Sequence, residues 1–201
     1  MMTRIIGLTG GIASGKSTVS NLLRQAGLPI IDADQVARQV QRPGSPALDK
    51  LAAAFGHKII TPDGHLDRQQ LGQRVFADPA ARQELDRIMQ PLIRDAIWQA
   101  VANFKQQGVA NVVLDVPLLF EASYDTDCDL VVVVRVSPAT ELQRLMARNG
   151  YSKAAAQARI AAQLPLRAKA AKADVVIDND GSLAQTQRQV AQLVEDLQGT
   201  R

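Results

Sequence analysis

The sequence predicts an α/β protein built on a doubly wound parallel sheet, and two patterns indicate this class. Short runs rich in Val and Ile recur along the chain, and a segment with helical periodicity follows most of them. The runs are continuous rather than alternating, so helices should cover both faces of the sheet. We expect strands at residues 5–8, 28–31, 111–116, 130–136 and 175–177.

The helices between these strands have recognisable ends. Residues 16–26 form the first predicted helix, and Gly27 is placed to close it. Ser137 is placed to cap a helix over residues 138–148, with Pro138 at its first position. Two further helices of this region are predicted at residues 34–41 and 182–197.

Two segments interrupt the alternation of strand and helix. The first, residues 41–108, reads as helical throughout, with predicted helices at residues 45–55, 67–76, 79–89 and 91–107. We therefore expect a core over residues 1–40 and 109–201 and a helical insert between them. The second segment, residues 149–173, is rich in Ala, Arg and Lys with weak apolar periodicity, which predicts helices that are poorly buried and mobile.

Length and composition exclude several classes of protein. A chain of 201 residues can bury about 70% of its unfolded surface, so it needs no disulfide or metal to fold. One cysteine, Cys128, and two histidines exclude a disulfide framework and argue against structural zinc. The net charge of +3 is too small to argue for nucleic acid, and no apolar run reaches the ~18–20 residues that span a membrane. We expect a cytoplasmic protein.

The strongest motif is G-x-x-x-x-G-K-[ST] at residues 10–17, the P-loop pattern. A predicted strand precedes it and a helix follows, so backbone N–H groups and the positive end of the helix dipole can surround phosphates. Lys16 should reach the β- and γ-phosphates, and the Ser17 hydroxyl should ligate Mg²⁺. The candidate nucleotide-binding residues are Gly11, Ile12, Ala13, Ser14, Gly15, Lys16, Ser17 and Thr18.

A P-loop alone does not choose among kinases, GTPases and motor ATPases. The chain has no Asn-Lys pair for guanine recognition, and its D-x-x-G match at residues 178–181 follows the last predicted strand. Two inserts instead favour a kinase that closes over two substrates, because phosphoryl transfer must exclude water.

Carboxylates follow two of the predicted strands. Asp32 and Asp34 lie at the carboxyl end of the second strand, where open α/β sheets bind ligands. We favour a functional Asp32 that orients or deprotonates an attacking hydroxyl, whereas Asp34 is equally suited to capping the next helix. Asp115 ends an apolar run that could hold Mg²⁺ through water, although any buried strand that ends in Asp fits that pattern.

Taken together, these motifs resemble the dephospho-coenzyme A kinase family almost end to end. Besides the P-loop, the resemblance rests on Ile31-Asp32-Ala33-Asp34, on Pro117-Leu118-Leu119-Phe120-Glu121, and on Ile177 with Asn179. It implies ATP-dependent phosphorylation of the ribose 3′-hydroxyl of dephospho-coenzyme A. It also implies a P-loop kinase core, a helical acceptor-binding insert over residues 41–108, and a lid over residues 149–166.

The resemblance also implies roles for individual residues. Asp32 matches the acid that activates the 3′-hydroxyl, and Arg144 and Asn179 match positions near the adenine of ATP. Arg148, four residues after Arg144 and therefore on the same helix face, is expected to act in catalysis on the phosphates. Arg159 in the lid is a further candidate, with Gln163 at the same spacing.

Two departures from the family pattern bear on the site. Ala13 replaces the usual glycine, which is tolerable if the backbone there avoids a positive φ. Gln90 stands before Pro91 where the family has histidine, and glutamine cannot take up a proton.

Other functions remain open at this point. Another small P-loop kinase, acting on a nucleoside monophosphate or a metabolite alcohol, is the nearest alternative. A non-catalytic ATP-bound switch follows, and nucleic-acid binding comes third. The partner we expect is a small molecule, with neither nucleic acid nor a membrane involved, and the sequence does not determine the oligomeric state.

Overall fold

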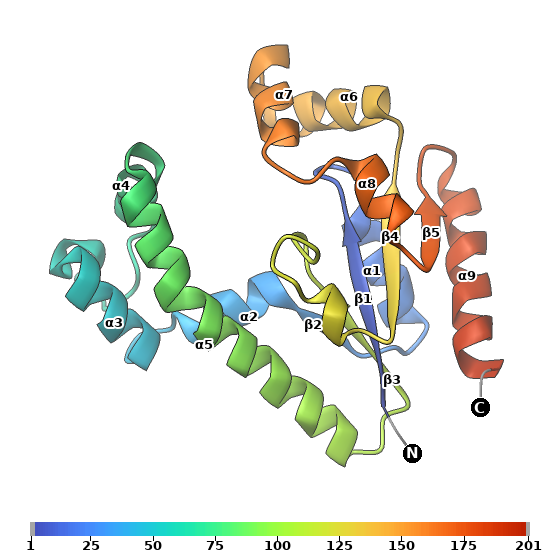
Figure 1. Cartoon of the computed structure of the whole chain (residues 1–201), viewed down its shortest axis with the longest axis horizontal. Coiled ribbons are helices and arrows are strands. Elements are labelled where there is room, and N and C mark those ends of the chain that lie inside the picture. Colours follow the sequence, from blue (N-terminus) through green and yellow to red (C-terminus); the bar gives the residue numbers. More distant parts are fainter. Residues whose placement is uncertain (1–2, 200–201) are drawn as a thin grey trace. The chain divides into compact units, whose positions relative to one another are not determined.

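The computed structural model describes residues 3–199, so the outermost residues of the predicted core, 1–2 and 200–201, lie outside the described part. Its centre is a five-stranded sheet in the order β2-β3-β1-β4-β5 (Figure 1). The pairings β1–β3, β1–β4 and β4–β5 are parallel. The strands are β1 Arg4–Gly10, β2 Ile30–Asp32, β3 Asn111–Asp115, β4 Leu130–Arg135 and β5 Val175–Asp178. The predicted fold class is confirmed, and so are all five predicted strands.

The helices alternate with these strands and fill the two inserts. They are α1 Lys16–Gln25, α2 Ala33–Val40, α3 Pro46–Phe55, α4 Arg68–Ala77, α5 Pro79–Gln106, α6 Pro138–Asn149, α7 Lys153–Ala161, α8 Leu166–Ala171 and α9 Leu183–Gly199. Two short 3₁₀ turns lie at His57–Ile59 and Asp125–Asp127. The predicted caps are confirmed: Gly27 follows α1 with φ 87°, and the Ser137 hydroxyl accepts from the N–H of Thr140 at the start of α6.

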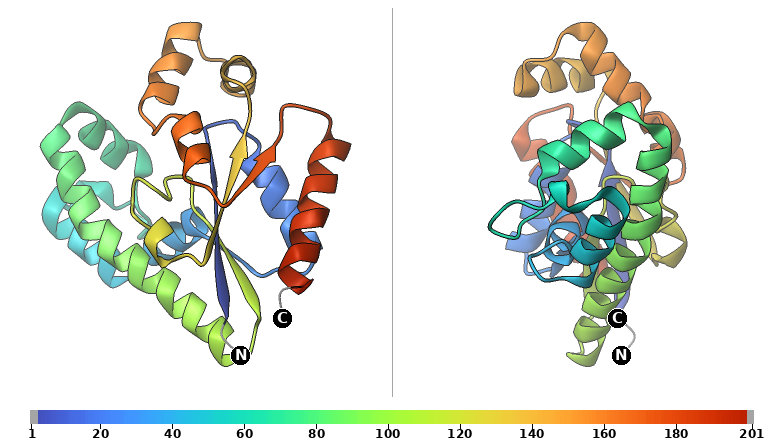
Figure 2. Two further views of the ribbon diagram at one scale, coloured as in Figure 1. Left: turned by 45° about the vertical axis from the view of Figure 1, so that its right-hand side comes forward. Right: turned by 90° about the vertical axis from the view of Figure 1, so that its left-hand side faces the viewer.

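One face of the sheet is covered by α1 and α9, which lie against each other (Figure 2). The buried core between these helices and the strands is aliphatic, as a chain with 3% aromatic residues requires. Its members are Ile6, Leu8, Val19, Leu23, Val113, Val132, Val134, Ile177, Val190, Leu193 and Leu197. This packing fixes the first turn of α1 against the carboxyl end of β1.

The strand register determines which residues flank the end of β1. Leu8 lies opposite Asp115 of β3, and Gly10 lies opposite Val134 of β4. The residues that follow β1 therefore emerge between the ends of two parallel neighbours, the edge where open α/β sheets bind ligands.

The chain divides into two compact units, one made of the residues up to Ile31 with those from Phe104 onward, and one made of Asp32–Asn103. The second unit has a core of its own, contributed by α3, α4 and the first half of α5. Its buried residues are Ala47, Leu51, Phe55, Ile59, Leu71, Ala81, Ile88 and Met89.

Two predicted helices in this unit are in fact one. The sequence predicted an interruption before Pro91, but α5 runs through it from Pro79 to Gln106. A proline inside a helix loses one backbone hydrogen bond and costs about 3 kcal/mol. Met89 before the proline and Leu92 after it pack in the same cluster, so side-chain burial on both sides outweighs that cost.

The second insert forms α7 and α8, as predicted, and most of α7 is exposed. The prediction of poor burial is wrong for Ala156 and for Lys169, both of which are fully buried. A lysine can be buried in this way only with partners for its charge. Among residues 3–199 no helix is long and apolar enough to cross a bilayer.

Candidate nucleotide-binding site

The phosphate-binding turn joins Gly10, the last residue of β1, to Lys16, the first residue of α1. Gly15 caps α1 in the left-handed conformation with φ 87°, and its carbonyl accepts from the N–H groups of Thr18 and Val19. An added Cβ on Gly15 would collide with the side-chain amide of Asn179. Glycine is therefore required here both by backbone conformation and by space.

Ala13 also adopts a positive φ, of 60°. The condition under which alanine was expected to be harmless at this position is therefore not met. The left-handed region brings Cβ close to the next carbonyl and costs an alanine about 1–2 kcal/mol. Surrounding contacts must hold the turn in this conformation.

Several backbone N–H groups of the turn remain available to an anion. The N–H of Ser14 donates to Gly11 O at 3.1 Å, which shapes the turn. In the described structure, no acceptor is present for the N–H groups of Ala13, Gly15, Lys16 and Ser17. These donors lie at the positive end of the α1 dipole, an arrangement that favours a phosphate group.

Lys16 forms an ion pair with Asp115 at the end of β3. Asp115 is buried, with 5% of its side chain exposed, and Lys16 is 20% exposed. The carboxylate therefore holds the ammonium group close to the turn. Asp115, which the sequence offered as a water-mediated metal ligand, contacts the lysine of the P-loop in this structure.

Arg144 and Asn179 lie beside the turn, on α6 and just after β5. The side-chain amide of Asn179 donates to Ser14 O at 2.8 Å, and its oxygen accepts from the Thr186 hydroxyl at 2.8 Å. Arg144 donates to Asn179 O at 3.0 Å. The structure thus brings together two of the residues predicted to contact the nucleotide.

The other two arginines do not contact the turn. Arg148 is exposed and donates to its neighbour Asn149 at 2.8 Å. Arg159 lies over the ring of Tyr151, 4.0 Å from the ring centre, and donates to Ala155 O. A catalytic role for Arg148 stays a prediction, and so does a phosphate contact for Arg159.

Asp32 ends β2 and caps α2. Its Oδ1 accepts from the N–H groups of Asp34 at 2.9 Å and Gln35 at 3.1 Å. The cap is therefore Asp32, whereas the sequence left this role open mainly for Asp34. Capping uses one carboxylate oxygen, and the catalytic role of Asp32 stays a prediction.

Sequence reasoning missed a set of polar residues behind the turn. Gln163, in the segment between α7 and α8, accepts from the N–H of Ile12 at 3.1 Å. Glu121 accepts from the N–H of Leu164 at 3.0 Å and pairs with the buried Lys169 at 2.9 Å. The sequence offered Glu121 only as part of the Pro117–Glu121 motif of the resemblance, and Gln163 only through its spacing of four residues from Arg159, and it indicated neither contact.

Glu141, in the first turn of α6, was missed as well. It is buried, and its carboxylate lies against Gly11, where it fills the space that a Cβ would take. Burial raises the pKa of Glu141, and the nearby charge of Lys169 opposes that rise. A carboxyl group whose charged form is disfavoured by burial therefore lies beside the turn.

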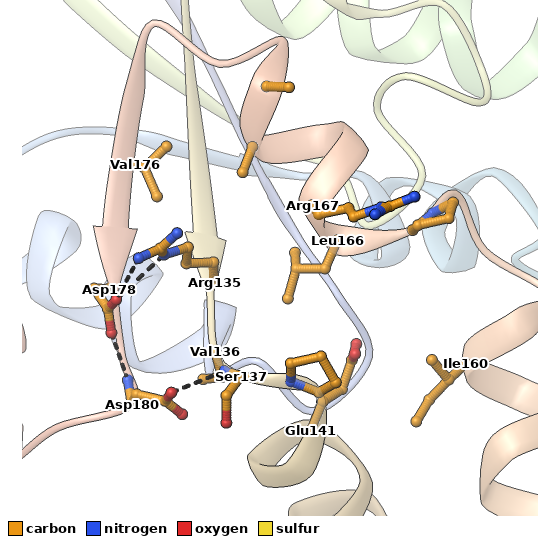
Figure 3. Close-up of a pocket in the computed structure, with 14 residues that line it drawn as sticks. Arg135, Val136, Ser137, Glu141, Ile160, Leu166, Arg167, Val176, Asp178 and Asp180 are labelled. Atoms are coloured by element: carbon orange, nitrogen blue, oxygen red, sulfur yellow. Dashed lines mark hydrogen bonds and ion pairs between the residues drawn. The ribbon is translucent and has the colours of Figure 1, made fainter.

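A cavity of about 930 Å³ has Glu141 and Leu166 among its lining residues, which Figure 3 shows as sticks. Apolar side chains such as Val176 and Ile160 form part of its wall, and the Arg135–Asp178 ion pair, at 3.0 Å, lies at another part. Asp180 accepts from the N–H of Ser137 at 2.9 Å. Hydrogen bonds from Thr140 and Ser137 lower the pKa of Asp180.

The geometry is that of a P-loop nucleotide site, and comparison with known proteins decides the family. The family model described as dephospho-CoA kinase matches residues 4–185. The chain belongs to the dephospho-CoA kinase family. It is accordingly a kinase with a P-loop fold.

Individual members of the family agree closely with this chain. A dephospho-CoA kinase from Lactiplantibacillus plantarum is 52% identical over 94% of this chain and 95% of its own length. One from Symbiobacterium thermophilum is 51% identical over 93% of this chain and 78% of its own length. The solved dephospho-CoA kinase from Campylobacter jejuni is 28% identical and superposes with a TM-score of 0.78, covering 100% of both chains. The dephospho-CoA kinase match therefore includes both the turn and the helical unit.

Proposed function

We propose that this chain transfers the γ-phosphoryl group of ATP to the ribose 3′-hydroxyl of dephospho-coenzyme A. The observation that carries the proposal is the phosphate-binding turn, with its unpaired N–H groups and adjacent Lys16, in a chain that matches the dephospho-CoA kinase family over residues 4–185. The product of this reaction is coenzyme A, and we expect it to be made in the cytoplasm.

The turn binds the triphosphate in this proposal. Its four unpaired N–H groups and the α1 dipole attract the phosphate oxygens. Lys16 exchanges Asp115 for the β- and γ-phosphates, which carry more negative charge. Arg144 and Asn179, which already contact each other beside the turn, bind the adenosine end.

The residues at the turn fit Mg²⁺. Ser17 is exposed in the first turn of α1 and offers a hydroxyl oxygen, the hard donor that Mg²⁺ prefers, while phosphates and water supply most other ligands. When bound, the ion neutralises charge on the phosphate oxygens.

Asp32 acts on the acceptor. Its carboxylate orients the 3′-hydroxyl and takes up its proton as the ribose oxygen bonds to the γ-phosphorus. The bond from that phosphorus to the β–γ bridging oxygen breaks, and ADP leaves with the electron pair. Because Oδ1 is used by the cap of α2, the proton is expected on Oδ2.

The helical unit is expected to bind the acceptor. A cavity of about 420 Å³ lies within it, and Gln39, Arg42 and Gln99 are among its lining residues. A cationic side chain with neighbouring amides suits the phosphates and amides of dephospho-coenzyme A, which supports this assignment.

An acceptor panel tests the substrate. Purified protein with ATP and Mg²⁺ should release ADP with dephospho-coenzyme A and not with nucleoside monophosphates or simple alcohols. A preference for a nucleoside monophosphate would refute the proposed acceptor. Release of ADP with no dependence on any acceptor would refute a kinase of this specificity.

Two substitutions test the role of Asp32. Asparagine caps helices as well as aspartate, so Asp32→Asn should keep the fold while turnover falls by orders of magnitude and ATP binding stays close to normal. Asp34→Asn, two residues away on α2, is the matched control and should turn over far faster. Equal turnover in the two variants would remove Asp32 from the reaction.

A further inference from the structure

The segment of residues 163–166, here called the strap, crosses the first half of the phosphate-binding turn. Gln163 Oε1 accepts from the N–H of Ile12 at 3.1 Å. Leu166 lies close to the turn, since a Cβ added to Gly11 would be 3.2 Å from its Cδ2. The strap therefore makes a hydrogen bond to Ile12 and places an apolar side chain close to the neighbouring Gly11.

Hydrogen bonds and an ion pair to residues outside the strap fix its position. The N–H of Leu164, next to Gln163, donates to Glu121 at 3.0 Å. Glu121 pairs with Lys169, which is fully buried and also donates to Pro117 O at 3.1 Å. The backbone next to Gln163 is thus bonded to the loop after β3. The side chain of Gln163 therefore extends toward Ile12 from a fixed position.

The residue after Ile12 is the strained Ala13, with φ 60°. A non-glycine residue persists in the left-handed region only where neighbouring contacts hold it there. The N–H of Ile12 belongs to the Gly11–Ile12 peptide unit, one peptide before the unit that joins Ile12 to Ala13. A fixed acceptor for this N–H therefore restrains the turn immediately ahead of the strained residue. On the other side, Ser14 N donates to Gly11 O.

We infer that Gln163 is a positioning residue, which holds Ile12 so that the Ala13 turn keeps the conformation that binds phosphate. Its carboxamide supplies the acceptor for Ile12, and the N–H groups of Ala13, Gly15, Lys16 and Ser17 are left for the nucleotide. The side chain is neutral, so it satisfies the N–H without placing a negative charge beside the triphosphate. The inference rests on the proposed function, because it concerns nucleotide binding at the same turn.

A double-substitution cycle tests the inference through the strain at Ala13. Gln163→Leu removes the acceptor at similar volume. It should weaken binding of ADP with Mg²⁺ by about five- to tenfold, through one lost hydrogen bond and the release of the strained turn. Glycine reaches φ 60° without strain, so in the Ala13→Gly background the same Gln163→Leu substitution should weaken binding by only about twofold.

Kinetics separate positioning from a general structural effect. Gln163→Leu should raise the KM for ATP by a similar factor while kcat and the KM for dephospho-coenzyme A change by less than about twofold. Gln157→Leu on α7 is the matched control, since Gln157 is exposed and should leave all three constants unchanged. Calorimetry with ADP and Mg²⁺ measures binding independently of turnover.

The outcomes are distinct. If Gln163→Leu binds ADP as tightly as Gln157→Leu does, Gln163 has no positioning role. If its effect is equally large with alanine or glycine at position 13, it does not act through the strained turn, and the inference is overturned. Failure of the unsubstituted protein to bind ADP would refute the proposed function itself, and the inference would fall with it.

Discussion

The ion pair between Glu121 and Lys169 gives a stability prediction that the structure makes quantitative. Lys169 is fully buried, and its ammonium group lies 2.9 Å from Glu121 Oε1 and 3.1 Å from Pro117 O. Glu121→Gln preserves shape but leaves the buried ammonium without its counter-charge. Removing one partner of a buried pair costs about 3–5 kcal/mol. Because Glu121 is 27% exposed, we expect the lower end, about 3 kcal/mol.

Thermal and chemical denaturation measure this change. For a chain of this size each kcal/mol shifts Tm by about 2–4 °C, so Glu121→Gln should lower Tm by about 6–12 °C. The double variant Glu121→Gln with Lys169→Met removes both charges and should recover much of the loss. The matched control is Glu84→Gln, which breaks an exposed pair with Arg87 that solvent screens, and it should lower Tm far less than Glu121→Gln does. Equal Tm values for the two single glutamine variants would refute the reasoning.

The same ion pair predicts how the difference in stability between the unsubstituted protein and Glu121→Gln depends on pH. Burial opposes ionisation of Glu121, but the hydrogen bonds from Lys169 and Leu164 outweigh it and lower the pKa below its ordinary value of 4.5. A carboxylate with a lowered pKa stabilises the folded state above its unfolded pKa, and this contribution disappears as the pH falls through the folded pKa. The stability gap between the unsubstituted protein and Glu121→Gln should therefore narrow below about pH 4.5. Urea titrations at several pH values measure the gap, and a constant gap would contradict this account.

Three further predictions follow from the turn and its surroundings. Burial raises the pKa of Glu141, so its ionisation destabilises the fold as the pH rises; Glu141→Gln should increase stability at pH 7 and lose this advantage in acid, as urea titrations can show. Asp115→Asn frees Lys16 from its ion pair and should tighten ADP binding without Mg²⁺ several-fold by calorimetry, whereas weaker binding would mean that Asp115 orients the lysine for phosphate. Gly15→Ala adds left-handed strain of about 1–2 kcal/mol and displaces Asn179, so it should abolish most nucleotide binding, and binding within twofold of normal would show that the turn tolerates a Cβ.

The sequence was sufficient for the features that depend on local patterns. Continuous aliphatic runs predicted the strands, and Ser137 and Gly27 marked helix ends where the structure has them. The P-loop was predictable because its chemistry is confined to consecutive residues. The interruption at Pro91 was predicted wrongly, since local propensity cannot register the tertiary packing on both sides of the proline.

The sequence could not predict the contacts that cross long separations. The bond from Ile12 to Gln163 spans 151 residues, and the bond from Asn179 to Ser14 spans 165. The sequence around Gln163 or Asn179 has no pattern that indicates the partner of its side chain. Lys169 lies in an Ala-rich helix, where a lysine is normally predicted to be exposed. The positive φ of Ala13 had one signal in the sequence, the glycine that the resembling family has at this position, but an alanine there does not itself indicate a left-handed conformation.

The two long-range contacts share one chemical feature, because each joins an amide side chain to the backbone of the turn. Asn179 donates to Ser14 O on one half of the turn, and Gln163 accepts from Ile12 N on the other. Both side chains are neutral amides, so they fix the turn without adding charge of either sign where the phosphates bind. The positive potential at the turn comes instead from Lys16, from the α1 dipole and from Arg144 beside the turn, and Lys16 is paired with Asp115. Gln163 thus restrains the backbone of the turn without carrying charge, whereas Lys16 supplies charge, so substitutions of these two residues should alter nucleotide binding in different ways.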